Sequence, residues 1–163
     1  MLARRLVLAL AVVAFTPAVA AAQADLGRKP TAKEIAAIGD CATKYQDDVS
    51  EAERRCLFDL VATPCTKTPA GSANLGAADC YRAEQAIWDD LLNRNYKTLL
   101  DRLDDDQAAK ARAMERAWIA YRDTTCGFYA DKIRGSMAIP MAGACAARET
   151  ARRALLLGLF SRL

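Results

Sequence analysis

The chain has 163 residues, of which 53% are hydrophobic and 26% charged, and its formal net charge is +3. This small basic excess argues against a general nucleic-acid binder, which needs many lysines and arginines to neutralise phosphates. The chain contains no histidine, which excludes a Ser–His or Cys–His catalytic pair, and no glycine-rich phosphate loop, cofactor motif or metal motif is present. We therefore expect a non-enzyme without a cofactor or a metal.

The first 24 residues are typical of a secretory signal peptide. Arg4 and Arg5 give a basic start, residues 6–15 form an apolar run, and residues 18–24 hold two small-x-small cleavage motifs. The apolar run is shorter than the ~20 residues that a transmembrane helix needs. We predict a periplasmic or secreted protein without a stable membrane anchor, whose mature net charge is +1 after loss of the two arginines.

All six cysteines follow the predicted cleavage site. An even number of cysteines in an exported chain predicts disulfides. Spacings of 15, 15 and 19 residues favour three local bridges among the many possible pairings. A zinc site is disfavoured because the chain lacks both histidine and a Cys-x-x-Cys motif. The expected pairs are Cys41–Cys56, Cys65–Cys80 and Cys126–Cys145.

Residues 25–64 predict a short helical segment. A capping box at residues 31–34 starts a helix that extends to about residue 46. A second capping box at residues 50–53 starts the next helix, which Pro64 ends. Two short antiparallel helices would bring the first pair of cysteines together.

Residues 63–77 contain two prolines and two glycines and predict a loop. Cys65 and Cys80 would cross-link its ends. The simpler interpretation is a connector. The alternative is a binding loop, because exposed and cross-linked loops commonly bind partners.

Three longer helices are expected in the rest of the chain. The first runs from residue 77 or 78 to about 103. The second begins after an acidic turn at 104–107 and ends near Gly135, and the last covers 142–160. No segment alternates as a strand does. The predicted fold is all-α, a small disulfide-stapled domain built on an antiparallel helix hairpin with a C-terminal packing helix.

The stretch from Ala117 to Cys126 concentrates aromatic and charged side chains. Helical spacing puts its aromatics on one face with the neighbouring apolar residues. In the hairpin Asp89 would lie near Arg122, so we expect an ion pair inside a buried polar network. The predicted members of this structural network are Asp89, Asn93, Tyr96, Trp118, Tyr121, Arg122, Asp123 and Thr150.

A hydrolase is the enzymatic alternative, with Glu84 and Asp89 as paired carboxylates. Ordinary helix-surface composition surrounds these two acids, so the sequence disfavours a catalytic pair. The network is therefore interpreted as structural, and no catalytic residue is expected.

Charge is distributed unevenly along the chain, with a net −4 over residues 84–106 and +6 over residues 107–163. The hairpin turn carries Asp101, Asp104, Asp105 and Asp106. These acids are candidate contacts for a cationic protein partner. A solvated turn that caps the next helix is the alternative.

An ordered set of motifs runs through the second part of the chain. In order, the motifs are Cys65, Cys80, Asp89-x-x-Leu92-Asn93-x-x-Tyr96, Arg116-Ala117-Trp118-Ile119-x-Tyr121-Arg122-Asp123-x-x-Cys126, Gly135-Ser136, Cys145 and Thr150-x-x-Arg153 or the neighbouring Arg152. In this combination the chain resembles the lysozyme inhibitor LprI-like family of exported bacterial proteins. The resemblance covers residues 65–163 and leaves 25–64 outside. Glu115 stands where the family usually has glutamine, and Arg134 where it often has glycine.

The resemblance implies a small helical exported domain. The named member of the family inhibits lysozyme. We therefore expect a binding protein that occludes a lysozyme-type muramidase with the acidic turn or the loop at 65–80. The alternative is a periplasmic structural or accessory protein that binds a different envelope protein and no lysozyme.

Overall fold

A computed structural model describes residues 27–163, so the predicted signal peptide lies outside the described residues. This part of the chain contains helices and no strand, which confirms the all-α prediction. None of its helices is both long and apolar enough to cross a membrane. The helices are α1 (Ala32–Lys44), α2 (Val49–Cys56), α3 (Ala62–Thr66), α4 (Asn74–Leu100), α5 (Asp105–Ile133) and α6 (Ala138–Phe160).

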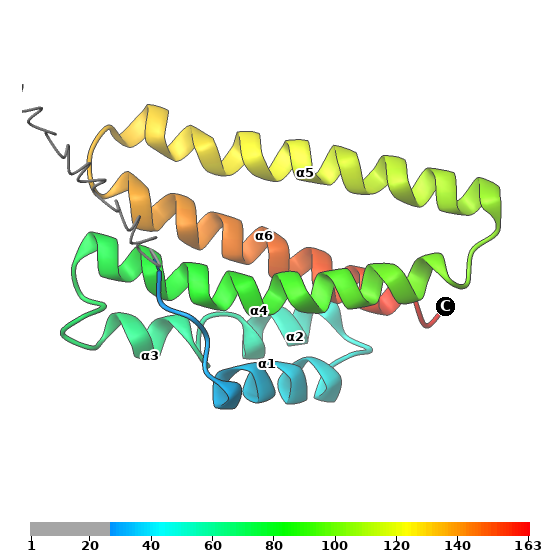
Figure 1. Cartoon of the computed structure of the whole chain (residues 1–163), viewed down its shortest axis with the longest axis horizontal. Coiled ribbons are helices and arrows are strands. Elements are labelled where there is room, and N and C mark those ends of the chain that lie inside the picture. Colours follow the sequence, from blue (N-terminus) through cyan, green and yellow to red (C-terminus); the bar gives the residue numbers. More distant parts are fainter. Residues whose placement is uncertain (1–26) are drawn as a thin grey trace, which may run out of the picture.

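The two longest helices, α4 and α5, run antiparallel and are joined by a tight turn, as the hairpin prediction requires (Figure 1). The C-terminal helix α6 lies between them in this view and packs most extensively against α4 and next against α5. The short helices lie together on the side of α4 away from α5 in this view, where α3 packs against α4, α1 against α2, and α2 against α6 (Figure 1). The packing helix is therefore the centre of the domain, and it separates much of α4 from α5.

The composition of α6 explains its central position. Alanine and glycine recur along it, and such small side chains let neighbouring helices approach closely. Burial extends around much of the helix circumference rather than along one stripe. The buried positions are Ala138, Pro140, Cys145, Ala147, Thr150, Ala151, Arg153, Ala154, Leu155, Leu157 and Gly158.

One hydrophobic core joins the N-terminal helices to α4 and α6. Ile38 of α1 and Trp88 of α4 have no exposed surface, and both belong to the same cluster as Leu157 of α6. Residues 32–66 therefore contribute side chains to the core that the long helices form.

The helix starts agree with the sequence at two positions and differ at one. Reciprocal capping boxes join Thr31 to Glu34 and Asp104 to Gln107. The box expected at residues 50–53 is wrong, because Asp48 caps α2 by accepting a bond from the Glu51 N–H at 2.9 Å. Aspartate caps a helix as well as serine does, and the earlier start lengthens a short helix.

The prolines are placed differently from the prediction. Helix α2 ends at Cys56, and Pro64 lies in the first turn of α3, where its missing N–H costs no hydrogen bond. Pro140 lies likewise in the first turn of α6. The expected loop at 63–77 is thus shortened by α3 and by the start of α4 at Asn74, and α6 begins four residues earlier than expected.

Three disulfides join consecutive helices, in the pairing that the spacing predicted. Cys41–Cys56 links α1 to α2, Cys65–Cys80 links α3 to α4, and Cys126–Cys145 links α5 to α6. Their Cα atoms are 5.8, 5.7 and 5.4 Å apart, within the ordinary range for a disulfide.

Removing the first disulfide should destabilise the protein without changing its helical fold. We expect the double replacement Cys41→Ala with Cys56→Ala to lower the free energy of unfolding by ~3 kcal/mol, the value for a loop of this length in the chain-entropy model. Urea denaturation followed by circular dichroism measures the change. A loss of less than ~0.5 kcal/mol, the size of an ordinary surface substitution, would show that the bridge does not constrain the unfolded chain.

Candidate functional site

The stretch from Ala117 to Cys126 lies in the second half of α5, and the helix buries a face different from the predicted one. Glu115 and Cys126 are buried, whereas Tyr121 is 54% exposed and Phe128 is 62% exposed. The reason is that α5 packs mainly on α6, so the face that meets α6 is covered. The prediction that Tyr121 belongs to a buried polar network is therefore wrong.

A buried ion pair joins α5 to α6. Both Nε and Nη2 of Arg153 donate to Oε2 of Glu115, at 2.9 and 2.7 Å. The two side chains are only 7% and 9% exposed. Within residues 27–163, Oε1 of Glu115 is buried without a hydrogen-bond partner. Each charge is tolerated in the core because the other is present.

Two guanidinium groups lie over the ring of Trp118. The Arg122 guanidinium is 4.9 Å from the centre of that ring and that of Arg153 is 5.7 Å away. Because Arg153 belongs to α6, its cation–π attraction to the Trp118 ring stabilises the contact between α5 and α6. Trp118 therefore has the structural role that the sequence predicted, but its interhelical neighbour is Arg153 of α6 rather than a residue of α4.

The expected Asp89–Arg122 ion pair does not form among the described residues. Asp89 accepts a bond from the Asn93 amide at 3.2 Å on its own helix. Arg122 pairs with the adjacent Asp123 at 2.8 Å, near the surface. The predicted pairing of Asp89 with Arg122 is wrong because it assumed that α4 and α5 contact each other directly, whereas α6 lies between them.

The other two members of the predicted network are also separated from it. Thr150 donates its hydroxyl to the Ala146 carbonyl oxygen at 2.8 Å, within α6. Tyr96 is partly buried and packs against the hydrophobic core. The predicted residues thus form several local contacts, and the buried ion pair between α5 and α6 is made by Glu115 and Arg153 instead.

Glu84 of α4 is a fully buried carboxylate. Its Oε1 accepts bonds from the backbone N–H of Phe58 at 2.8 Å and from the Trp88 indole at 3.2 Å, and its Oε2 accepts one from the Ala62 N–H at 2.9 Å. These bonds tie the turn between α2 and α3, where Phe58 has a left-handed φ of 69°, to α4. Without solvent access Glu84 does not act on a substrate, which removes the carboxylate pair considered for a hydrolase.

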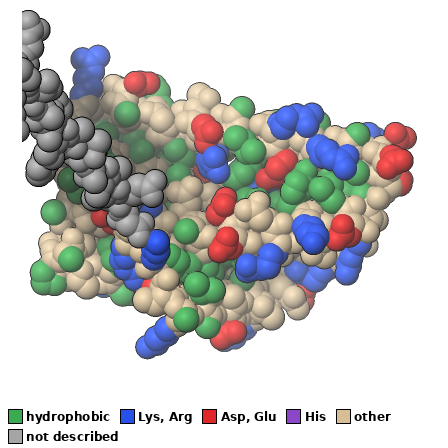
Figure 2. All heavy atoms as spheres, viewed as in Figure 1, with side chains coloured by type: hydrophobic (Ala, Val, Ile, Leu, Met, Phe, Trp, Pro, Cys, Tyr) green, Lys and Arg blue, Asp and Glu red, His purple; other side chains and the backbone are tan. Residues whose placement is uncertain are grey.

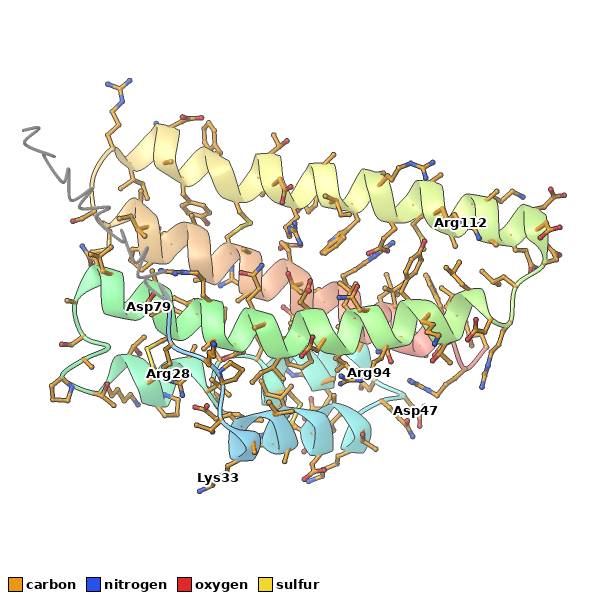
Figure 3. The ribbon with its side chains drawn as sticks, in the orientation of Figure 1. Arg28, Lys33, Asp47, Asp79, Arg94 and Arg112 are labelled. Carbon is orange, nitrogen blue, oxygen red and sulfur yellow. A yellow bond between two sulfur atoms is a disulfide. The ribbon has the colours of Figure 1, made fainter. Side chains whose placement is uncertain are left out.

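The cross-linked loop after α3 is tightly packed. A Cβ atom at Gly71 would lie 2.2 Å from the Cys65 carbonyl oxygen, and one at Gly76 would lie 1.9 Å from that of Ala70. A pocket of ≈ 400 Å³ lies beside this loop, with Arg28 and Asp79 among its lining residues (Figure 3). Arg28 is paired with Glu34 there.

The acidic turn is exposed at the end of the molecule where α4 meets α5 (Figure 2). Asp101, Asp104, Asp105 and Asp106 are all solvent-exposed. Asp104 also accepts a bond from the Gln107 N–H at 2.8 Å, which fixes the start of α5. Within the part of the chain that the structure describes, no group of three or more potential metal ligands is present.

The profile of the family described as "Lysozyme inhibitor LprI" matches residues 65–157, more than half of the chain. The chain belongs to the lysozyme inhibitor LprI family. The matched span begins at Cys65 and covers α4, α5, most of α6 and two of the disulfides. No curated protein and no solved structure matches the chain.

Membership of the LprI family bears on the kind of protein and on its location. The family is named for lysozyme inhibition, which is consistent with the expectation of a binding protein. Together with the three disulfides, the family points to an exported protein. Helices α1 and α2 lie outside the matched part of this LprI family member.

The sequence analysis did not predict that Glu84 and Glu115 are buried, although the sequence contains a signal for the burial of each. Glu84 lies midway between Cys80 and Trp88 at intervals of four, so it shares their buried face. Glu115 shares a face with Ala108, Ala111 and Cys126 by the same reasoning. An acid inside an apolar stripe indicates a buried carboxylate that needs donors, but the sequence does not indicate which donors.

Breaking the buried ion pair should be costly. We expect Arg153→Met alone to lower the free energy of unfolding by ~3–5 kcal/mol, because it leaves the Glu115 charge buried and unpaired. Adding Glu115→Leu to that variant should recover most of the loss. Chemical denaturation of both variants measures the difference. Asp89→Asn is the control and should change stability by less than ~0.5 kcal/mol; similar losses in the single and double variants would contradict the pair.

Glu84 should make stability depend on pH. Burial raises the pKa of its carboxyl above the ordinary 4.5, although three N–H donors oppose the shift. The folded state therefore binds the proton more tightly than the unfolded state. The Glu84 contribution to the free energy of unfolding is complete below pH 4.5 and is lost as pH rises through the folded pKa.

The measurement compares urea unfolding of the wild type and Glu84→Gln at several pH values from about 4 upwards. The wild type should lose stability relative to the variant as pH rises. Asp90→Asn, at an exposed position of the same helix, is the matched control and should follow the wild type. A difference that is constant or grows with pH would contradict a raised pKa.

Proposed function

We propose that this protein is an exported inhibitor of lysozyme-type muramidases that acts in the periplasm or outside the cell. The observation that carries the proposal is the match to the lysozyme inhibitor LprI family over α4, α5 and α6. Inhibition by a protein without catalytic groups requires only that it occupy the cleft of the enzyme. A rigid helical projection is suited to that task, because little conformational entropy is lost on binding.

The acidic turn is the contact that we assign to a cationic lysozyme. Residues 101–106 carry four aspartates and one arginine, so the turn has a net charge of −3. The ion pairs formed among the described residues all use other acids, which leaves these carboxylates available to a partner. Complementary charge increases the association rate with a cationic enzyme and weakens as salt is added.

An alternative is an accessory envelope protein that binds another partner. Exposed apolar side chains at the end of the domain opposite the turn favour it, since Leu75 is 64% and Met137 53% exposed. These residues lie at the starts of α4 and α6 (Figure 1). The two functions use opposite ends of the molecule, so they predict different effects of substitutions in the turn.

Inhibition of peptidoglycan hydrolysis by egg-white lysozyme tests the proposed function. The oxidised protein should inhibit at micromolar concentration. Replacing Asp104, Asp105 and Asp106 together by asparagine should weaken inhibition at least ~10-fold at low salt, equal to ~1.4 kcal/mol. Asparagine at the first position keeps the helix cap, so the variant should remain folded.

The matched control replaces Asp40, Asp59 and Asp131 by asparagine, because these exposed acids lie away from the turn. It changes the net charge equally and should inhibit as the wild type does. Absence of inhibition of egg-white and bacterial lysozymes by the wild type would refute the function. Capture of a different envelope protein, unaffected by the turn substitutions, would support the alternative.

A further inference from the structure

A shallow apolar pocket lies beside the acidic turn. Its volume is ≈ 420 Å³, and it lies where the end of α4, the start of α5 and the end of α6 meet. Leu99 and Ala111 are 5% and 6% exposed and form its buried part. The half-buried side chains of Leu103, Met114 and Phe160 complete the apolar lining.

The polar edge of the pocket connects it to the acidic turn. Gln107 lines the pocket and is bonded twice to Asp104, as donor to its carboxylate at 2.8 Å and as acceptor from its N–H at 3.2 Å. Lys110 also lines the pocket, four residues after Asp106 on the same exposed side of the turn, and no ion pair joins these two residues in the part of the chain that the structure describes.

The charges of the turn therefore dominate on one side of the pocket. The partial negative charge at the end of α4 and the partial positive charge at the start of α5 meet here and oppose each other. The side-chain charge of residues 101–106, a net −3, is therefore not compensated by the helix ends. Figure 2 shows hydrophobic side chains gathered near this end of the molecule, with the acidic side chains of the turn beyond them and basic side chains at other edges.

We propose that this pocket anchors one apolar side chain, aromatic or long aliphatic, from a protein loop whose neighbouring residues are lysine or arginine. The apolar side chain enters between Leu103 and Met114, and the cations beside it face the aspartates of the turn. Binding hot spots are commonly large side chains that fill a well-packed pocket, and complementary charges around such an anchor increase specificity and the association rate. The proposal rests on the proposed function only for the identification of the partner as a lysozyme.

The pocket beside the 65–80 loop does not offer the same combination. Arg28 and Glu34, which both line it, already neutralise each other, and Asp79 is paired with Arg82 at 2.5 Å. The tip pocket combines an apolar interior with acids that form no ion pair among residues 27–163, which is the arrangement expected for a cationic partner.

Filling the pocket tests the proposal in the lysozyme assay. Ala111→Leu extends an apolar side chain into the pocket and should weaken inhibition at least ~10-fold. Ala113→Leu adds the same atoms to an exposed position of α5 outside the pocket, and should inhibit as the wild type does. Leu103→Ser, which removes part of the apolar wall, is a second test should the first variant be unstable. Thermal unfolding verifies that each variant is folded.

A second measurement does not depend on lysozyme. The oxidised protein, labelled at leucine and methionine methyl groups, is titrated with the blocked peptides Lys-Trp-Lys, Ser-Trp-Ser and Glu-Trp-Glu. Shifts should be confined to methyl groups of Leu99, Leu103 and Met114. Lys-Trp-Lys should bind at least ~10-fold more tightly than Glu-Trp-Glu, and this preference should disappear in the turn variant with three asparagines.

The outcomes separate the pocket from the function. Inhibition that Ala111→Leu leaves unchanged would overturn the pocket as the anchor while the inhibitor function stands. Failure of the wild type to inhibit any lysozyme, together with peptide shifts at the pocket, would refute the function and retain the pocket. Peptide shifts elsewhere, no shifts, or a preference for Glu-Trp-Glu would overturn the pocket. Concentration-dependent methyl shifts without peptide would identify a second copy of the chain as the occupant, which also contradicts the proposal.

Discussion

The burial of α6 between α4 and α5 is the constraint on which the rest of the domain depends. A helix covered on several sides has to combine small residues, for close approach, with full compensation of any charge that it carries. Arg153 is that charge, and it requires Glu115 on α5 and lies over the ring of Trp118. The same burial moves α5 away from α4, so Tyr121 faces solvent and Asp89 does not reach Arg122.

A second buried acid organises the other side of α4. Glu84 accepts bonds from the turn between α2 and α3, so this carboxylate and the Cys65–Cys80 disulfide hold that turn and α3 against α4. The Cys41–Cys56 disulfide links α1 to α2. These contacts hold the first half of α4, and the Cys126–Cys145 disulfide joins α5 to α6, whereas the hairpin turn lies at the opposite end of the two long helices (Figure 1). A binding surface at that end is preorganised, which reduces the entropy lost when a partner docks.

The proposed inhibitory surface combines features that neither charge nor hydrophobicity alone provides. The aspartates of the turn supply attraction at a distance, and the pocket of Leu99, Leu103 and Met114 supplies a place for one apolar side chain. Charge mainly affects association and specificity, whereas a desolvated anchor mainly affects dissociation. Both belong to residues 65–157, the part of the chain that carries the family.

Local information is sufficient for much of this structure. The helix caps at Thr31 and Asp104, the all-α class, the disulfide pairs and the family follow from residue type and spacing, because each depends on neighbours a few residues apart or on an ordered motif. Periodicity also indicates that a helix buries one face, but it does not identify the neighbour that covers it. The tertiary structure alone decided that α6 lies in the centre and that Glu115 rather than Asp89 forms the buried ion pair with a neighbouring helix. It also decided that the Glu84 carboxylate binds backbone groups 22 and 26 residues away. The physical reason is that packing selects among several faces of similar hydrophobicity, and a buried charge takes whichever partner the packing brings within reach.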